Sequence, residues 1–152
     1  MERLYVYKSP MGALFCTMSA NGFCRISFED PATDEGVPLP DPYAAELQEY
    51  FRGRSVPLNW TVDLRGTEFQ RSVWRMVQTV GFGQTTTYKR IADALGTKGY
   101  RAVGQAVGRN PVLLVVPCHR VLGTHGLGGF GGGLALKQLL LELETALPRD
   151  YA

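Results

Sequence analysis

Residues 88–108, YKRIADALGTKGYRAVGQAVG, decide the architecture of the second half of the chain. Their pattern predicts two short helices, residues 88–95 and roughly 100–108, joined by the turn Gly96-Thr97-Lys98-Gly99. This is helix-turn-helix spacing. An ordinary helical hairpin has the same spacing, so the basic residues nearby are what favour a nucleic-acid-binding motif.

Downstream of these helices, a cysteine stands beside a histidine in the run Pro117-Cys118-His119-Arg120-Val121. The preceding residues 112–116 are continuously apolar and predict a buried strand that ends at Pro117, because proline cannot donate to a ladder. Cys118 is therefore expected at a strand end. A thiol is nucleophilic only as the thiolate, so the adjacent imidazole predicts a reactive cysteine. The alternative is a small buried hydrophobe, which is the usual state of a free cysteine.

A third member of this group is predicted on the last helix, residues 134–147, which Pro148 stops. At 100° per residue, Glu144 falls about 40° from Leu140, whereas Glu142 falls about 200° away, in solvent. A carboxylate on an apolar face needs a partner, and an imidazole would supply one. A Cys-His-Glu arrangement and a structural ion pair with Arg or Lys both remain open. The apolar face itself comprises Leu136, Leu140, Leu143 and Leu147.

The sequence pattern of residues 1–62 predicts a small α/β domain. Strands are expected at residues 4–7, 13–18 and 23–28, the last two forming a hairpin around Asn21-Gly22. Centred on that dipeptide, Cys16 faces Ser27 and Cys24 faces Ser19. A Pro-, Asp- and Gly-rich loop follows, and then a helix that begins at Asp41-Pro42 and ends at Gly53. Residues 55–63 are the expected linker, which divides the chain into domains 1–62 and 63–152.

The second domain is predicted to be mainly helical, so the whole chain belongs to the α+β class. It opens with Thr67-Glu68-Phe69-Gln70, the pattern of a capping box. A glycine-rich loop, residues 126–133, precedes the last helix. Residues at helical spacing after the capping box are expected in the core: Phe69, Val73, Trp74, Val77 and Val80.

Composition places the chain among ordinary globular proteins. It has 152 residues, 45% hydrophobic and 20% charged, with neither a membrane-span nor a signal pattern. Residues 1–62 carry five Lys/Arg and eight Asp/Glu, a net −3, and residues 63–152 carry eleven and six, a net +5. The basic second part favours a polyanionic partner. Three cysteines without disulfide or metal-like pairing predict a reduced, cytoplasmic protein.

In its motifs the chain resembles the O6-alkylguanine-DNA alkyltransferases, most strongly from Thr67 to Glu144. The family's active-site motif matches residues 117–121, and its recognition helix and hinge match residues 101–104 with Asn110-Pro111. Residues 87–92 match the helix before it, residues 132–144 the closing segment, and residues 9–12 the N-terminal strand signature. The resemblance implies a ribonuclease H-like N-terminal domain with a short sheet and a helix, followed by a DNA-binding domain with a helix-turn-helix.

The resemblance also implies the chemistry. Cys118 would take a methyl or larger alkyl group from O6-alkylguanine, or from O4-alkylthymine, once per molecule. His119 would deprotonate it through a water, with Glu144 orienting the imidazole. Tyr88 would donate towards the departing O6. Small Ala102 and Gly104 suit a helix in the minor groove, and Arg101 would replace the flipped base. Asn110 would brace the turn before the cysteine, and Val121 would line the base pocket.

One departure concerns the glycine-rich loop, where the family usually has Tyr-Ser or Tyr-Ala and this chain has Phe130-Gly131. The phenolic hydroxyl is lost, but the ring can still pack on an alkyl group. Residues 1–62 hold no zinc-like Cys/His set, and the reaction needs no cofactor and no metal. The protein is expected to be monomeric. Three other hypotheses are a cysteine hydrolase, a non-catalytic alkyltransferase-like damage sensor and a purely structural DNA-binding domain.

Overall fold

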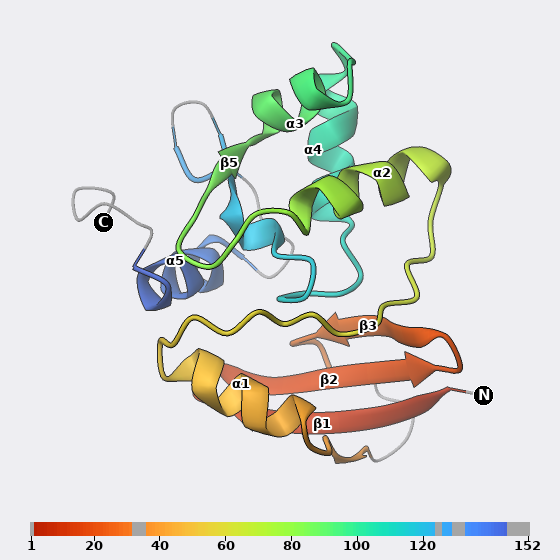
Figure 1. The fold of residues 1–152 in the computed structure, drawn as a ribbon, viewed down its shortest axis with the longest axis vertical. Helices are drawn as coiled ribbons and strands as arrows, with labels where there is room; N and C mark the ends of the chain where they lie inside the picture. The colour runs from red at the N-terminus through yellow and green to blue at the C-terminus, as the bar shows by residue number, and fades with distance from the viewer. Residues whose placement is uncertain (1, 32–35, 124–125, 129–132, 146–152) are drawn as a thin grey trace. The chain divides into compact units, whose positions relative to one another are not determined.

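The computed structural model describes residues 2–31, 36–123, 126–128 and 133–145. The chain divides into two compact units, Met1–Arg65 with Pro111–Val115, and Gly66–Asn110 with Val116–Ala152. A sheet dominates the first unit and helices dominate the second (Figure 1). The predicted α+β class is therefore confirmed. No helix among the described residues is both long and apolar enough to cross a membrane.

The first unit is a four-stranded sheet with one helix over a face (Figure 1). Strands β1 (Arg3–Ser9), β2 (Gly12–Ser19) and β3 (Gly22–Ser27) run antiparallel where strands were predicted, and the short β4 (Val37–Pro38) adds parallel to β1. Helix α1 (Tyr43–Phe51) buries Leu47 and Tyr50. Its N-cap is Pro42, one residue later than the predicted Asp41, and the Asp41 carboxylate accepts from the Ala45 amide at 3.0 Å.

The β2–β3 hairpin forms with a register that differs from the predicted one. Cys16 pairs with Ile26 rather than Ser27, and Ser19 pairs with Gly22. The turn is centred on Ala20-Asn21, one residue earlier than predicted, and a bulge between Thr17 and Met18 shifts the remaining pairs. The extra residue breaks the alternation of β3, where Phe23 and Cys24 are buried in succession. All three cysteines are free thiols.

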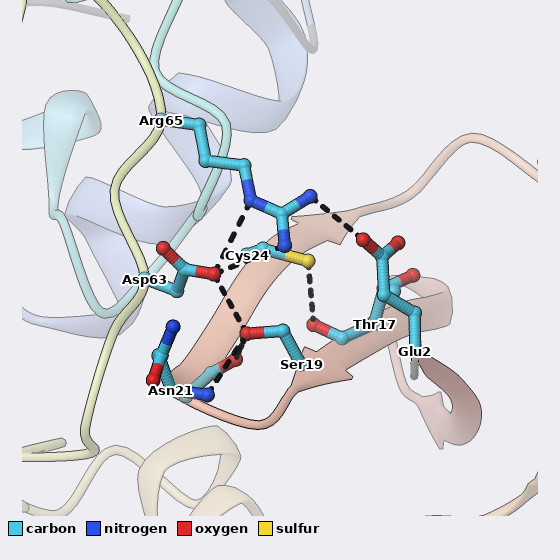
Figure 2. Close-up of polar contacts among 8 residues, drawn as sticks. Glu2, Thr17, Ser19, Asn21, Cys24, Asp63 and Arg65 are labelled. Carbon is cyan, nitrogen blue, oxygen red and sulfur yellow. Dashed lines mark hydrogen bonds and ion pairs between the residues drawn. The ribbon is translucent and has the colours of Figure 1, made fainter.

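The linker that follows α1 is attached to this hairpin by backbone contacts and by the side-chain contacts of Asp63 and Arg65 shown in Figure 2. The Phe23 amide donates to the Thr61 carbonyl at 2.9 Å, and the Asp63 amide donates to the Phe23 carbonyl at 2.8 Å. Ser19 Oγ donates to Asp63 Oδ2 at 2.6 Å, and this bond lowers the pKa of the Asp63 carboxyl. Arg65 joins Asp63 and Glu2, so the end of the linker is fixed to the first unit.

Residues 112–116 do not form the predicted strand. Val112 makes an isolated bridge with Ile26, and Leu114 adopts a left-handed conformation with φ of 71°. A β-ladder cannot continue through such a residue. Val112, Leu114 and Val115 are nevertheless buried, which accounts for the apolar character of the run. A continuous apolar pattern does not distinguish a buried irregular segment from a buried strand.

Helix α2 (Glu68–Val77) opens the second unit, and its capping box is present as predicted. Val73, Trp74 and Val77 are buried, but Phe69 is 39% exposed and Val80 is half-buried, so the predicted core was wrong for Phe69. Phe69 lies in the first turn, where fewer neighbouring residues cover the helix. Trp74 joins this helix to the next pair, since its Nε1 donates to the Ala106 carbonyl at 2.7 Å.

The remaining elements of the second unit surround the Cys-His motif. Helices α3 (Tyr88–Ala94) and α4 (Tyr100–Gly108) occur where predicted. The unpredicted strands β5 (Thr86–Thr87) and β6 (Val121–Leu122) pair in parallel and bring the start of α3 beside the residues after the motif. The last helix, α5 (Leu134–Leu143), ends four residues before the predicted end, and Leu147 lies outside the described residues.

Candidate active site

Cys118 begins a short 3-10 turn, η1 (Cys118–Arg120), rather than following a regular strand. Its amide donates to the Val116 carbonyl at 2.8 Å, and the Arg120 amide donates to the Pro117 carbonyl at 2.9 Å. Asn110 Nδ2 donates to the same Val116 carbonyl at 2.7 Å. Asn110 therefore ties the end of α4 to the backbone immediately before the cysteine.

The Cys118 thiol is almost completely buried, at 4% exposure. Burial raises the pKa of this thiol to about 11, although the Asn110 side chain, the Lys137 ammonium and the backbone amides of residues 118 and 119 act in the opposite direction. The resting residue is consequently a neutral thiol at physiological pH. A base must remove its proton during any reaction at sulfur.

His119 and Glu144 meet inside the second unit, as their positions in the sequence predicted. His119 Nε2 lies 2.7 Å from Glu144 Oε2, and both side chains are buried. Burial lowers the pKa of His119, while the hydrogen bond and charge of Glu144 act to raise it. A neutral imidazole in this arrangement holds its proton on Nε2, because the carboxylate accepts there. Its Nδ1 then carries a lone pair and can accept a proton.

Glu144 also forms the structural ion pair that the sequence left open as an alternative. Arg120 Nε donates to Oε1 at 2.8 Å and Nη2 donates to Oε2 at 3.0 Å. The Gly83 amide approaches Oε1 at 3.4 Å. Burial acts to raise the pKa of Glu144, but the hydrogen bonds from His119 and Arg120 outweigh it and lower the pKa to about 2. Glu144 therefore stays ionised in the folded protein at physiological pH.

Sequence reasoning missed Lys137, which is fully buried beside Cys118. Its Nζ donates to the Val121 carbonyl at 2.6 Å and lies 5.8 Å from the centroid of the Tyr88 ring. Burial lowers the pKa of Lys137 to about 8. The predicted face of α5 was centred on the wrong residues, and its buried positions are Lys137, Leu140, Leu141 and Glu144. Their i, i+3, i+4, i+7 spacing was visible, but a lysine was not counted as part of it.

Tyr88 is half-buried at the start of α3 and packs against two glycines. A Cβ at Gly104 would lie 4.0 Å from Tyr88 Cδ1, so α4 approaches the ring closely. A Cβ at Gly128, where φ is +74°, would lie 2.7 Å from Tyr88 Cε2 and 2.9 Å from its hydroxyl oxygen. Only a residue without a side chain fits there, and the ring is held over Lys137.

The other predicted site residues occupy separate places in the unit. Arg101 and Ala102 are exposed on α4, whereas Cys118 is buried. Val121 is buried directly after η1. Phe130 and Gly131 lie outside the described residues. Within the described part of the chain, no three His, Cys, Asp or Glu side chains gather in a way that could hold a metal ion.

The contacts of Glu144 predict a large difference between the two glutamates at the end of α5. Glu144→Gln leaves the buried Arg120 guanidinium without its counter-charge, so we expect the free energy of unfolding to fall by about 3–5 kcal/mol. Glu142 is exposed, and Glu142→Gln should change stability by less than about 0.5 kcal/mol. Urea unfolding at pH 7 measures both values.

Acid unfolding gives an independent check on the same carboxylate. The folded pKa of Glu144 is about 2, below the value of about 4.3 for an unfolded glutamate. Its stabilising contribution is therefore complete above pH 4.3 and is lost as the pH falls towards 2. The difference in stability between wild type and Glu144→Gln should shrink over that range, and a constant difference would contradict the ion pair.

Known proteins resemble both units of the chain. Residues 3–64 match the model for the ribonuclease-like domain of 6-O-methylguanine DNA methyltransferase, and residues 68–146 match the model for its DNA binding domain. The chain is 42% identical over 142 residues to the methylated-DNA–protein-cysteine methyltransferase of Sulfolobus acidocaldarius, covering 91% of this chain and 90% of that protein. The crystal structure of Mycobacterium tuberculosis OGT in complex with DNA matches with a TM-score of 0.84 and 37% identity, covering 97% of this chain and 96% of that one.

Proposed function

The chain belongs to the 6-O-methylguanine DNA methyltransferase family, as its motifs predicted, and from this we propose that it repairs DNA by transferring an alkyl group from O6-alkylguanine to its own Cys118. One observation carries the proposal. Cys118, the neutral His119 and the ionised Glu144 form one buried group in the second unit, next in sequence to the helix pair that resembles a DNA-binding motif.

The reaction begins from the neutral thiol. His119 accepts the thiol proton at Nδ1 through a bridging water, while Glu144 holds Nε2–H. Sulfur attacks the alkyl carbon, the S–C bond forms, and the C–O6 bond breaks. Tyr88 donates its hydroxyl proton to the departing guanine and becomes a phenolate, while His119 holds the thiol proton as an imidazolium. Exchange with solvent water then returns both groups to their neutral forms, so the net change moves one proton from the thiol to the base. The product is a thioether, which water does not readily cleave, so each molecule acts once. No cofactor is required.

Access to the alkyl group requires the base to leave the duplex, because O6 of a paired guanine lies on the major-groove edge, whereas α4 would bind in the minor groove and Cys118 is buried. Helix α4 enters the minor groove through small Ala102 and Gly104, and Arg101 occupies the space that the flipped nucleotide leaves. Val121 lines the base pocket. Asn110 braces the turn between α4 and Cys118, consistent with its bond to the Val116 carbonyl. Residues 63–152 thus carry DNA binding and catalysis, and residues 1–62 support them.

The range of substrates follows from the same pocket. We expect methyl and larger alkyl groups on guanine, and O4-alkylthymine, to be accepted. Three free thiols are consistent with a reducing, cytoplasmic compartment. The protein acts as a monomer on double-stranded DNA.

Intact-mass measurement tests the proposal directly. Pure protein mixed with excess duplex containing O6-methylguanine should gain one methyl group per chain, mapped to Cys118, and then stop reacting. Binding without a mass change would support a damage sensor instead. Turnover beyond one equivalent would support a hydrolase, and a label at Cys16 or Cys24 would remove Cys118 from the mechanism.

A further inference from the structure

Two side chains share a single oxygen of the buried Glu144 carboxylate. His119 Nε2 lies 2.7 Å from Oε2, and Arg120 Nη2 donates to the same Oε2 at 3.0 Å. Arg120 Nε occupies the other oxygen at 2.8 Å. The Arg120 side chain is only 9% exposed, so water screens this cation weakly. The Cys-His-Glu arrangement therefore has a fourth member, the charged Arg120.

The charge of Arg120 changes what the carboxylate does to the imidazole. A buried carboxylate alone would favour the imidazolium, because the opposite charges attract. Arg120 neutralises Glu144 and also repels a second positive charge on His119. The other charged group that acts on His119 is the Lys137 ammonium, which lies over the Tyr88 ring. The Cys118 thiol is next to His119 in the sequence and is neutral. Among these groups, Glu144 is the one anion and two cations oppose protonation of the imidazole.

We infer that Arg120 is a positioning residue that holds His119 as the neutral, Nε2-protonated base and thereby sets the pH range over which Cys118 reacts. The effect of Arg120 on His119 is independent of the proposed function, and its effect on the reaction of Cys118 rests on the proposed function. Only a neutral imidazole can accept the thiol proton. Removing Arg120 should therefore extend the protonated, inactive form of His119 to higher pH.

A purely structural role for Arg120 is the alternative explanation of the same contacts. Arg120 Nη1 donates to the Val80 carbonyl at 2.7 Å, so the guanidinium also joins the end of α5 to the segment after α2. If this were its whole purpose, replacing it would lower stability and activity at every pH. The midpoint pH of the His119 titration would then be unchanged.

Nitrogen-15 NMR of the full-length protein measures that titration. The chain has two histidines, and a His125→Gln variant assigns the signals of His119. In the wild type we expect a neutral His119 with the proton on Nε2 at pH 7. In Arg120→Gln the midpoint should rise by about one pH unit or more. The acid limb of the rate against pH, measured with free O6-benzylguanine, should move upward by the same amount.

Two further variants separate charge from packing. Arg120→Lys keeps the positive charge but loses the bidentate fork, so the His119 midpoint should return towards the wild-type value while the melting temperature falls. Arg75→Gln removes an exposed arginine from α2 and should move neither property. Restored titration without restored stability would show that charge, rather than the anchor to Val80, controls His119.

The inference fails on any of three results. A protonated His119 at pH 7 in the wild type overturns it. This result needs no variant, so the test holds even if Arg120→Gln does not fold. An unchanged midpoint in a folded Arg120→Gln, or an Arg120→Lys midpoint displaced as far as that of Arg120→Gln, also overturns it. If the midpoints behave as expected but DNA transfers no alkyl group, the proposed function fails while the assignment of His119 stands.

Discussion

Cys118→Ser will bind alkylated duplex DNA about as well as the wild type and will take up no alkyl group. The hydroxyl of serine is a far weaker acid and nucleophile than the thiol, and loss of a nucleophile costs on the order of 10⁴–10⁶ in rate. Cys118 is 4% exposed, so its sulfur contributes little surface to any DNA contact. Intact mass and fluorescence anisotropy with a labelled duplex measure the two properties separately.

Cys24 provides the matched control for this substitution. It is a free thiol in the first unit, and Cys24→Ser should retain full transfer. A methylated Cys118→Ser protein, or an inactive but folded Cys24→Ser protein, would contradict the assignment of the nucleophile. Loss of DNA binding in Cys118→Ser would show that the thiol has a structural role in the groove-binding region.

Arg101→Ala is expected to separate DNA repair from the chemistry at sulfur. Flipping a base costs a few kcal/mol of unstacking, and an inserted side chain offsets part of that cost. Because each 1.4 kcal/mol is a factor of ten, repair of O6-methylguanine in a duplex should slow by about a hundredfold or more. Arg101 is exposed on α4 and Cys118 is buried, so the rate with free O6-benzylguanine should stay near the wild-type rate.

Lys98→Ala is the control for general charge, because it removes one exposed cation from the turn before α4. It should weaken binding in a salt-dependent way without the large loss in repair rate. Single-turnover rates on both substrates, at two salt concentrations, provide the comparison. Equal slowing of Arg101→Ala on the duplex and on the free base would assign Arg101 to the fold or the pocket instead of the base stack.

Burial keeps the Cys118 thiol protonated in the resting protein. The pKa of Cys118 is raised to about 11, and that of Cys16, in the core of the first unit, to about 12. Both thiols are therefore poor nucleophiles towards electrophiles in solution. What distinguishes Cys118 is its surroundings, because His119, Lys137 and Asn110 all lie close enough to stabilise its deprotonated form.

The sequence by itself determined the features that depend on neighbouring residues. The starts of α1 and α2 follow from Asp41 and from the Thr67–Gln70 capping box, which are contacts within four residues. The burial of Glu144 and exposure of Glu142 follow from helical phase alone. The adjacency of Cys118 and His119 is covalent. In each case the residues that allow the prediction lie within about one helical turn of the residue whose position is predicted.

Only the tertiary structure decided which distant groups surround these residues. Lys137 lies beside Cys118, and Arg120 shares Glu144 with His119, because α5 packs on η1. The run 112–116 is buried without forming a strand. Apolar patterning reports that a segment is covered, but it does not report by what, since hydrophobic burial is not directional. The charges that set the state of His119 therefore became visible only when the fold brought two separate segments, η1 and α5, together.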